Sequence, residues 1–151
     1  MAPIFLDGRT SQNASIANSI NVPTTAAYAL WGQVGLNVSA ANPSLPIRVQ
    51  FSGTIDLKLN PAHVLPSNTV EVKVVRGSVS TDPVVFTAVK TLTADQANKS
   101  ELLTFVGSDY NVPKGNGSLI YTVFVRNITG SNESDVRRVG PESFNVLAIG
   151  N

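Results

Sequence analysis

The chain's one histidine, His63, is the first candidate for chemistry, because imidazole often acts as a general acid, a general base or a metal ligand near neutral pH. It lies between Pro61 and Pro66, in a segment that predicts a loop. No acidic or cysteine residue stands close to it, and no G-x-S-x-G elbow supplies a nucleophile. We therefore interpret His63 as a loop residue and expect no enzymatic activity.

Carboxylates are the second candidates, since their oxygens bind calcium. Asp82, Asp95 and Asp109 fall in predicted loops, but their spacing matches no known calcium-binding loop. The chain contains no cysteine, which excludes disulfide bonds, thiolate catalysis and zinc-thiolate sites. We expect no cofactor and no metal, and the residues alone leave open whether a loop binds calcium or a sugar.

The charge pattern argues against a nucleic-acid partner. The formal net charge is +1, and only 14% of residues are charged, whereas phosphate binding needs clustered Lys and Arg. Arg137 and Arg138 form the one adjacent basic pair. Because neighbouring residues of a strand point to opposite faces, we interpret this pair as ordinary surface charge.

The chain also shows no sign of membrane insertion or secretion. No segment approaches the roughly 20 apolar residues of a membrane span. No basic region followed by a long apolar run marks a secretory signal at the N-terminus. We expect a soluble protein that is made in the cytosol and has no membrane partner.

Alternating apolar and polar residues dominate residues 28–59. The run 47–59 alternates over thirteen residues and predicts a strand long enough to cross a sandwich. Residues 28–39 predict a half-buried strand in which Trp31 falls on the polar side. A large aromatic at such a position either anchors an interface or is covered by the N-terminal arm.

Further alternating runs predict strands near residues 70–75, 84–92, 102–110, 119–128 and 136–149. Residues 93–101 predict one helical turn or a polar loop. The run 119–128 is apolar on both faces, so we expect Phe124 on its second face to be covered by a neighbouring subunit or an overlaid arm. About eight strands with turns between them and no convincing helix predict an all-β fold, an antiparallel sandwich of jelly-roll type.

The N-terminal stretch MAPIFL stands apart from this pattern. Ile4, Phe5 and Leu6 are consecutive large apolar residues on a polar segment, so the tip either folds back or docks on another molecule. A weak strand is expected around residues 16–22. We assign residues 1–22 to a connector arm and residues 23–151 to the jelly-roll domain, and we expect the arm to be disordered in the isolated chain.

Four segments carry a resemblance to a known family: GQVGLNVSA, IRVQFSGTIDLKL, LIYTVFVRNI and RVGPESFNVLAIGN. They resemble the jelly rolls of tumour-necrosis-factor and complement-globular-head type in the spore-surface proteins of bacilli, over residues 26–151. The collagen-like stalk of the exosporium filament proteins is missing, and the MAPIFL arm takes its place. This form resembles the thin, cysteine-free type of endospore appendage subunit.

The resemblance implies a structural subunit that self-assembles into a fibre on the spore surface, the exosporium. Such a protein is made in the mother-cell cytoplasm without a signal peptide. Its partners would be copies of itself and other spore-surface proteins. The subunit-docking residues would be the tip, Ile4, Phe5 and Leu6, together with Trp31 and Phe124.

Burial of the three tip residues would contribute roughly 5 to 9 kcal/mol, against an association cost of about 4 to 15 kcal/mol. A durable fibre therefore needs further contacts, such as strand addition by the arm to a neighbour's sheet.

Two other functions remain open. One is a trimeric head domain that binds a carbohydrate or a receptor through loops such as residues 108–118. The other is a viral capsid jelly roll, which predicts a more basic arm than this one.

Overall fold

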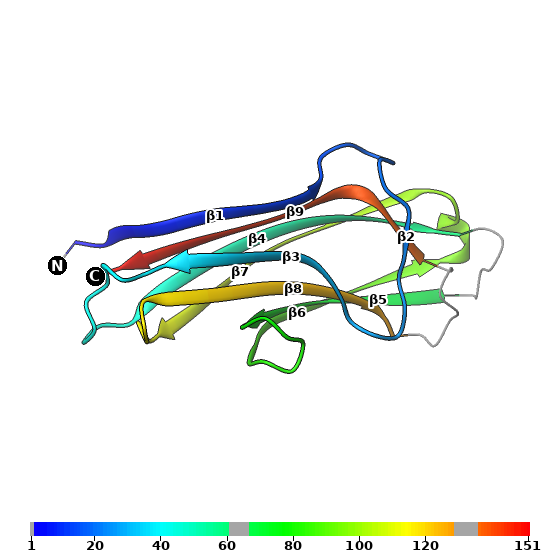
Figure 1. Cartoon of the computed structure of the whole chain (residues 1–151). Coiled ribbons are helices and arrows are strands. Elements are labelled where there is room, and N and C mark those ends of the chain that lie inside the picture. The colour runs from blue at the N-terminus through cyan, green and yellow to red at the C-terminus, as the bar shows by residue number, and fades with distance from the viewer. Residues whose placement is uncertain (1, 61–66, 129–135) are drawn as a thin grey trace.

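The computed structural model describes residues 2–60, 67–128 and 136–151, so His63 lies outside the described residues. Within these ranges the chain forms nine strands and one short 3-10 helix, Ala94–Gln96, which confirms the helical turn expected near residue 94 (Figure 1). The strands are β1 Ile4–Ala14, β2 Val22–Pro23, β3 Ala29–Asn37, β4 Ile47–Leu59, β5 Ser67–Arg76, β6 Val84–Thr93, β7 Ser100–Val112, β8 Ser118–Asn127 and β9 Val136–Gly150. None of the described helical residues make a helix long and apolar enough to cross a membrane.

The strands form two antiparallel sheets that pack face to face. The first sheet has the order β1-β9-β4-β7, with β2 also paired to β9, and the second has the order β3-β8-β5-β6. From β3 onward the chain passes repeatedly between the two sheets, as the ribbon in Figure 1 shows. The predicted antiparallel sandwich of jelly-roll type is confirmed.

The core lies between the sheets, and β4 shows why this sequence builds it. The apolar positions of the thirteen-residue alternation are buried, whereas most of the polar positions between them face outward. Gly53 lies in the inner row, where a Cβ atom would come within 2.3 Å of the Phe105 ring. Each large apolar side chain that is removed from water in this way contributes about 1.5 to 3 kcal/mol.

Trp31 is placed differently from the expectation. A bulge in β3 between Leu30 and Gly32 shifts the alternation by one residue, so Trp31 turns inward and is only 2% exposed. Its ring meets Phe105 and Phe144 edge to face, with centroid distances of 6.2 and 6.5 Å. The tryptophan expected on the outer face is therefore a core residue of its own chain, and Leu30 takes the outer position, 48% exposed.

Phe124 lies on the outer face of β8, as expected, and is 6% exposed. Its cover comes from Tyr28 of the same chain, whose ring lies 6.1 Å away at a steep angle. Lys73 and Arg126 in turn lie over the Tyr28 ring, at 3.8 and 4.3 Å from its centroid. The segment that leads into β3 thus supplies the cover that we expected from an arm or a neighbouring subunit.

A partly buried polar contact joins the two sheets near the β7 edge of the first sheet. Arg76 of β5 donates two hydrogen bonds to the Asp109 carboxylate of β7, at 2.7 and 3.0 Å, and the Tyr121 hydroxyl of β8 donates a third at 2.8 Å. Burial, followed by the contact with Asp109, strongly raises the pKa of Tyr121 and keeps its hydroxyl protonated. The sandwich body is therefore held by a polar contact as well as by its core.

Candidate assembly surface

The N-terminal arm forms a strand on its own sheet. β1 pairs with β9 in antiparallel register from Ile4, opposite Gly150, to Ala14, opposite Glu142, with irregularities near residues 6 and 13. In Figure 1 it lies along the side of the sandwich as the first strand of the sheet. The disorder that we expected for the isolated chain is not found, because the exposed edge of β9 offers the arm a ladder of backbone hydrogen bonds.

Side chains of β1 also reach the second sheet. The backbone N–H of Asn37 donates to Asp7 Oδ2 at 2.8 Å, and that of Gln33 donates to Ser11 Oγ at 3.2 Å. The Asn37 N–H and, to a smaller extent, the Arg9 and Gly8 donors hold the pKa of Asp7 below its usual range. β1 therefore closes one side of the sandwich through backbone pairing to β9 and side-chain contacts to β3.

The three tip residues have different environments. Leu6 is half-buried and packs against the core, close to Gly150. Phe5 and Ile4 remain 67% and 44% exposed. A Cβ atom on Gly8 would lie 3.4 Å from the Phe5 ring, which places the ring against the outer side of β1. Of the five expected docking residues, only Ile4 and Phe5 present large exposed apolar surfaces, and Trp31 and Phe124 are buried within the chain.

Residues 15–21, which we call the hinge loop, connect β1 to β2. A buried polar cluster lies where β1 ends: Arg138 donates to both Glu142 oxygens, at 2.5 and 2.7 Å, and Asn13 Nδ2 donates to Glu142 Oε2 at 2.7 Å. Glu142 is fully buried and Arg138 is 5% exposed. Our interpretation of Arg138 as surface charge was therefore wrong. The strand period of two, which puts residues 138 and 142 on one face, was the signal that could have shown this.

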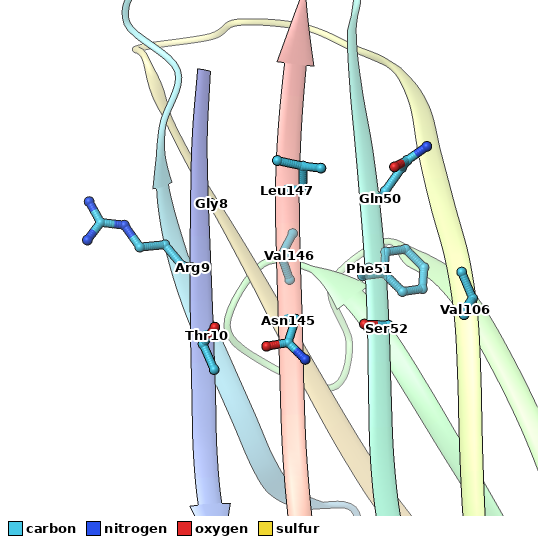
Figure 2. A pocket seen from close by; sticks show the side chains of 10 residues that line it. All are labelled: Gly8, Arg9, Thr10, Gln50, Phe51, Ser52, Val106, Asn145, Val146 and Leu147. Carbon is cyan, nitrogen blue, oxygen red and sulfur yellow. The ribbon is translucent and has the colours of Figure 1, made fainter. Parts of the chain in front are cut away.

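A groove of about 340 Å³ crosses the outer face of the first sheet. Figure 2 shows its side chains on β1, β9, β4 and β7. The register of the four strands places four residues side by side across the groove: Thr10, Asn145, Ser52 and Val106. These side chains offer hydroxyl, amide and methyl groups, and Arg9 is the one charged residue that lines the groove. The row depends on the pairing of four separate strands, which no local sequence pattern reveals.

The opposite edge of the first sheet also exposes apolar side chains. β7 pairs with β4 on one side, and no other described strand pairs with it. Three side chains on its outer face are largely exposed: Leu102 at 53%, Val106 at 79% and Tyr110 at 69%. An edge strand with such a face is suited to contact with another chain.

The acidic candidates for a metal site do not come together. Asp109 is occupied by Arg76 and Tyr121, and Asp82 accepts hydrogen bonds from the backbone N–H groups of Ser78 and Val79. Asp95 accepts a hydrogen bond from the hydroxyl of Thr93. Across the described parts of the chain, no three acidic, histidine or cysteine side chains are placed to hold a metal ion.

The sequence matches no protein-family model and no curated protein. Among solved structures, the chain is similar to an Eiger TNF from S. frugiperda, with 9% identity and a TM-score of 0.48 over 95% of this chain and 91% of that one. It is also similar to the CBM22-1 xylan-binding domain of Paenibacillus barcinonensis Xyn10C, with 13% identity and a TM-score of 0.40 over 99% and 86% of the two chains. A third similarity is to a chain of infectious bursal disease virus, Gx strain, with 9% identity and a TM-score of 0.48. It covers 97% of this chain and 32% of the viral one. The assignment of the fold rests on the strand pairing described above.

Proposed function

We propose that this protein is a structural subunit that self-assembles into a fibre by exchanging β1 between neighbouring subunits. The observation that carries the proposal is the way β1 is attached. It is an edge strand held mainly by backbone pairing, and Leu6 is its one side chain packed against the core cluster. β1 can therefore leave without opening the core, and the same register can form on the β9 edge of another copy.

Exchange by itself adds no net stabilisation, because each hydrogen bond that β1 breaks in its own subunit forms again in the neighbouring one. A net gain must come from new contacts, and the exposed Phe5 and Ile4 side chains are suited to make them. Full burial of each would contribute about 1.5 to 3 kcal/mol. The association cost is about 4 to 15 kcal/mol, so a stable fibre also needs contacts between sandwich bodies. A chain that gives its arm to one neighbour and receives an arm from another grows without closing.

The proposed location rests on the sequence resemblance. The segments that resemble spore-surface jelly rolls support a place on the surface of bacterial endospores. The fibre would be assembled in the mother cell, from copies of this chain and with other spore-surface proteins as neighbours.

The absence of cysteine makes a direct test of exchange feasible. Thr10 and Asn145 lie opposite each other in the β1–β9 ladder, at a spacing that a disulfide can bridge. A mixture of Thr10→Cys chains and Asn145→Cys chains should give oxidised heterodimers under conditions in which fibres form. Thr104→Cys in place of Asn145→Cys is the matched control, since Thr104 is exposed on the same sheet but does not pair with β1.

The doubly substituted chain, Thr10→Cys with Asn145→Cys, provides the second arm of the test. Oxidation of the isolated monomer should lock β1 in its own sheet and prevent fibres, and a reducing agent should restore them. Heterodimers no more abundant than with Thr104→Cys, or fibres from the locked monomer, would show that β1 is not exchanged.

The groove on the first sheet favours a second candidate, a head domain that binds a carbohydrate or another neutral ligand. Its volume of about 340 Å³ and its uncharged row of Thr10, Asn145 and Ser52 fit a ligand rich in hydroxyl groups. Solution mass separates the two candidates. A trimeric head has one finite mass, whereas a fibre gives a broad distribution that grows with concentration.

A further inference from the structure

A second pocket, of about 330 Å³, lies where the hinge loop meets the sandwich body. Asn18, Ile20 and Asn21 of the hinge loop form one wall. The body supplies the rest, with Lys58, Leu59, Asn60, Asn98, Arg137 and Val139. The pocket therefore spans the boundary between a segment that must move when β1 is exchanged and a segment that stays in place.

Two cations face each other in this pocket. Lys58 of β4 lies directly opposite Arg137 of β9 in the sheet ladder. Like charges in that relation destabilise a sheet. None of the described residues that line the pocket is acidic, and the ion pairs in the described parts of the chain involve neither of these two cations.

The hydrogen bonds of the pocket leave it rich in donors. Lys58 Nζ donates to Asn18 Oδ1 at 3.1 Å, and Arg137 Nη1 donates to Asn21 Oδ1 at 3.0 Å. Each bond uses one N–H of a group that carries three in lysine and five in arginine. Because the amide oxygens of Asn18 and Asn21 accept these bonds, their NH₂ groups add further donors at the same wall. Such a set of groups suits a ligand that carries only acceptors and a negative charge.

We propose that this pocket binds an oxyanion, a phosphate or carboxylate group, and that the bound anion holds the hinge loop to the body. The anion would sit between the two cations and relieve their repulsion, while the Asn18 and Asn21 amides bind it from the hinge side. A ligand that binds only the closed arrangement shifts the equilibrium toward it. The regulatory part of this inference rests on the proposed exchange of β1: oxyanions would keep the arm in its own sheet and slow assembly.

The binding is tested on the monomer, independently of any fibre. Inorganic phosphate and acetate are titrated separately against chloride at equal ionic strength, and the backbone amides of residues 18–21 are followed by NMR. Saturable shifts at these amides are expected with at least one of the two anions, which also identifies the preferred oxyanion. Lys58→Gln and Arg137→Gln should each weaken the affinity by about tenfold or more, since each removes a charged hydrogen-bond donor.

Arg48→Gln is the matched control, because Arg48 is an exposed cation elsewhere on β4 and should leave the titration unchanged. Shifts that fail to saturate with both anions, or that are equal in the wild type and in both pocket variants, would overturn the site. Each variant is first shown by fluorescence to be folded like the wild type. A loss of anion binding can then not be caused by unfolding.

Assembly is then measured with and without the preferred anion. The anion should slow fibre growth of the wild type, and it should have no such effect on Lys58→Gln or Arg137→Gln. Equal slowing in the wild type and in these variants would overturn the regulatory role while the titration still stands. A wild type that forms no fibres in any buffer counts against the proposed function, and the amide titration still decides the anion site.

Discussion

Asp7 is the residue that ties the arm to the second sheet, because its carboxylate accepts the Asn37 N–H at the edge of β3. The same carboxylate pairs with Arg9 at 3.1 Å. Both contacts favour the charged form, and its pKa is lowered accordingly. A single titratable group therefore makes the attachment of the arm to β3 dependent on pH.

We predict that acid loosens this attachment. A carboxyl group with a lowered folded pKa contributes its full stabilisation above the unfolded value, about 3.9, and loses it as the pH falls through the folded value. The Asn37 amide should therefore shift in NMR spectra below about pH 4. Asp7→Asn should remove this titration while keeping an acceptor for the amide. A titration of Asn37 that persists in the variant would assign it to another group.

The buried Arg138–Glu142 pair leads to a second prediction at this scale. Arg138→Met leaves the Glu142 carboxylate buried without its cation and should cost about 3 to 5 kcal/mol of unfolding free energy. The double change Arg138→Met with Glu142→Leu removes both charges and should recover most of that loss. Urea denaturation of the three proteins measures both effects. A single variant as stable as the wild type would show that the buried pair does not stabilise the fold.

At the scale of elements, β1 buries far less of its length than β4 does. β4 places a full inner row in the core, whereas β1 contributes Leu6, half-buried, and Ala14 at its end. Its attachment depends on the β9 ladder, on the hydrogen bond from Asn13 to Glu142 and on two side-chain contacts to β3. We therefore expect β1 to open more readily than the rest of the sandwich.

Leu6→Ala tests this expectation. Loss of a half-buried leucine should lower the stability of the closed arm by about 1 to 2 kcal/mol. Hydrogen exchange of the β1 amides should become faster, while amides paired between β4 and β9 keep their wild-type protection. Phe5→Ala is the control, because its ring is mostly exposed and should leave exchange nearly unchanged. A uniform loss of protection across both sheets would show that β1 opens only with the whole fold.

Sequence patterns predicted those elements whose residues alternate without interruption. The thirteen-residue alternation of residues 47–59 matches β4. On the second face of residues 119–128, Phe124 is covered, by Tyr28 of the same chain, whereas Ile120 is 41% exposed. The inward position of Trp31 was not predicted, because a one-residue bulge reverses the parity on which the prediction rested. The Thr10–Asn145 row and the Lys58–Arg137 pair were not predicted because they depend on the register between strands distant in the sequence.

At the scale of the whole molecule, we expect the sandwich body to hold together without the arm. The second sheet joins the first through the common core and through the Arg76–Asp109–Tyr121 contact. The two edges of the first sheet differ in character: β1 forms one edge, and β7 presents the exposed side chains of Val106 and Tyr110 at the other. In the proposed exchange, the β9 edge would receive the arm, and the β7 edge would be a separate surface for contacts between sandwich bodies.

Deletion of residues 2–8 should therefore abolish fibres and leave the body folded. Multi-angle light scattering is expected to show a monomer in place of a broad mass distribution, and the core amides should stay protected from hydrogen exchange. Replacement of residues 2–8 by a Gly/Ser segment of equal length controls for chain length. Filaments of normal appearance from the deleted protein would rule out the tip as the connector.

β1 is attached both to β9 and to β3, and this has a further consequence for a growing filament. One subunit at the tip would have donated its arm without receiving another, which leaves the β9 ladder and two β3 amides facing water. The subunit at the opposite tip would keep an unplaced arm. The filament would thus be polar, with two chemically different ends. A free peptide with the sequence of residues 2–14 would cap the first end and leave the second end growing.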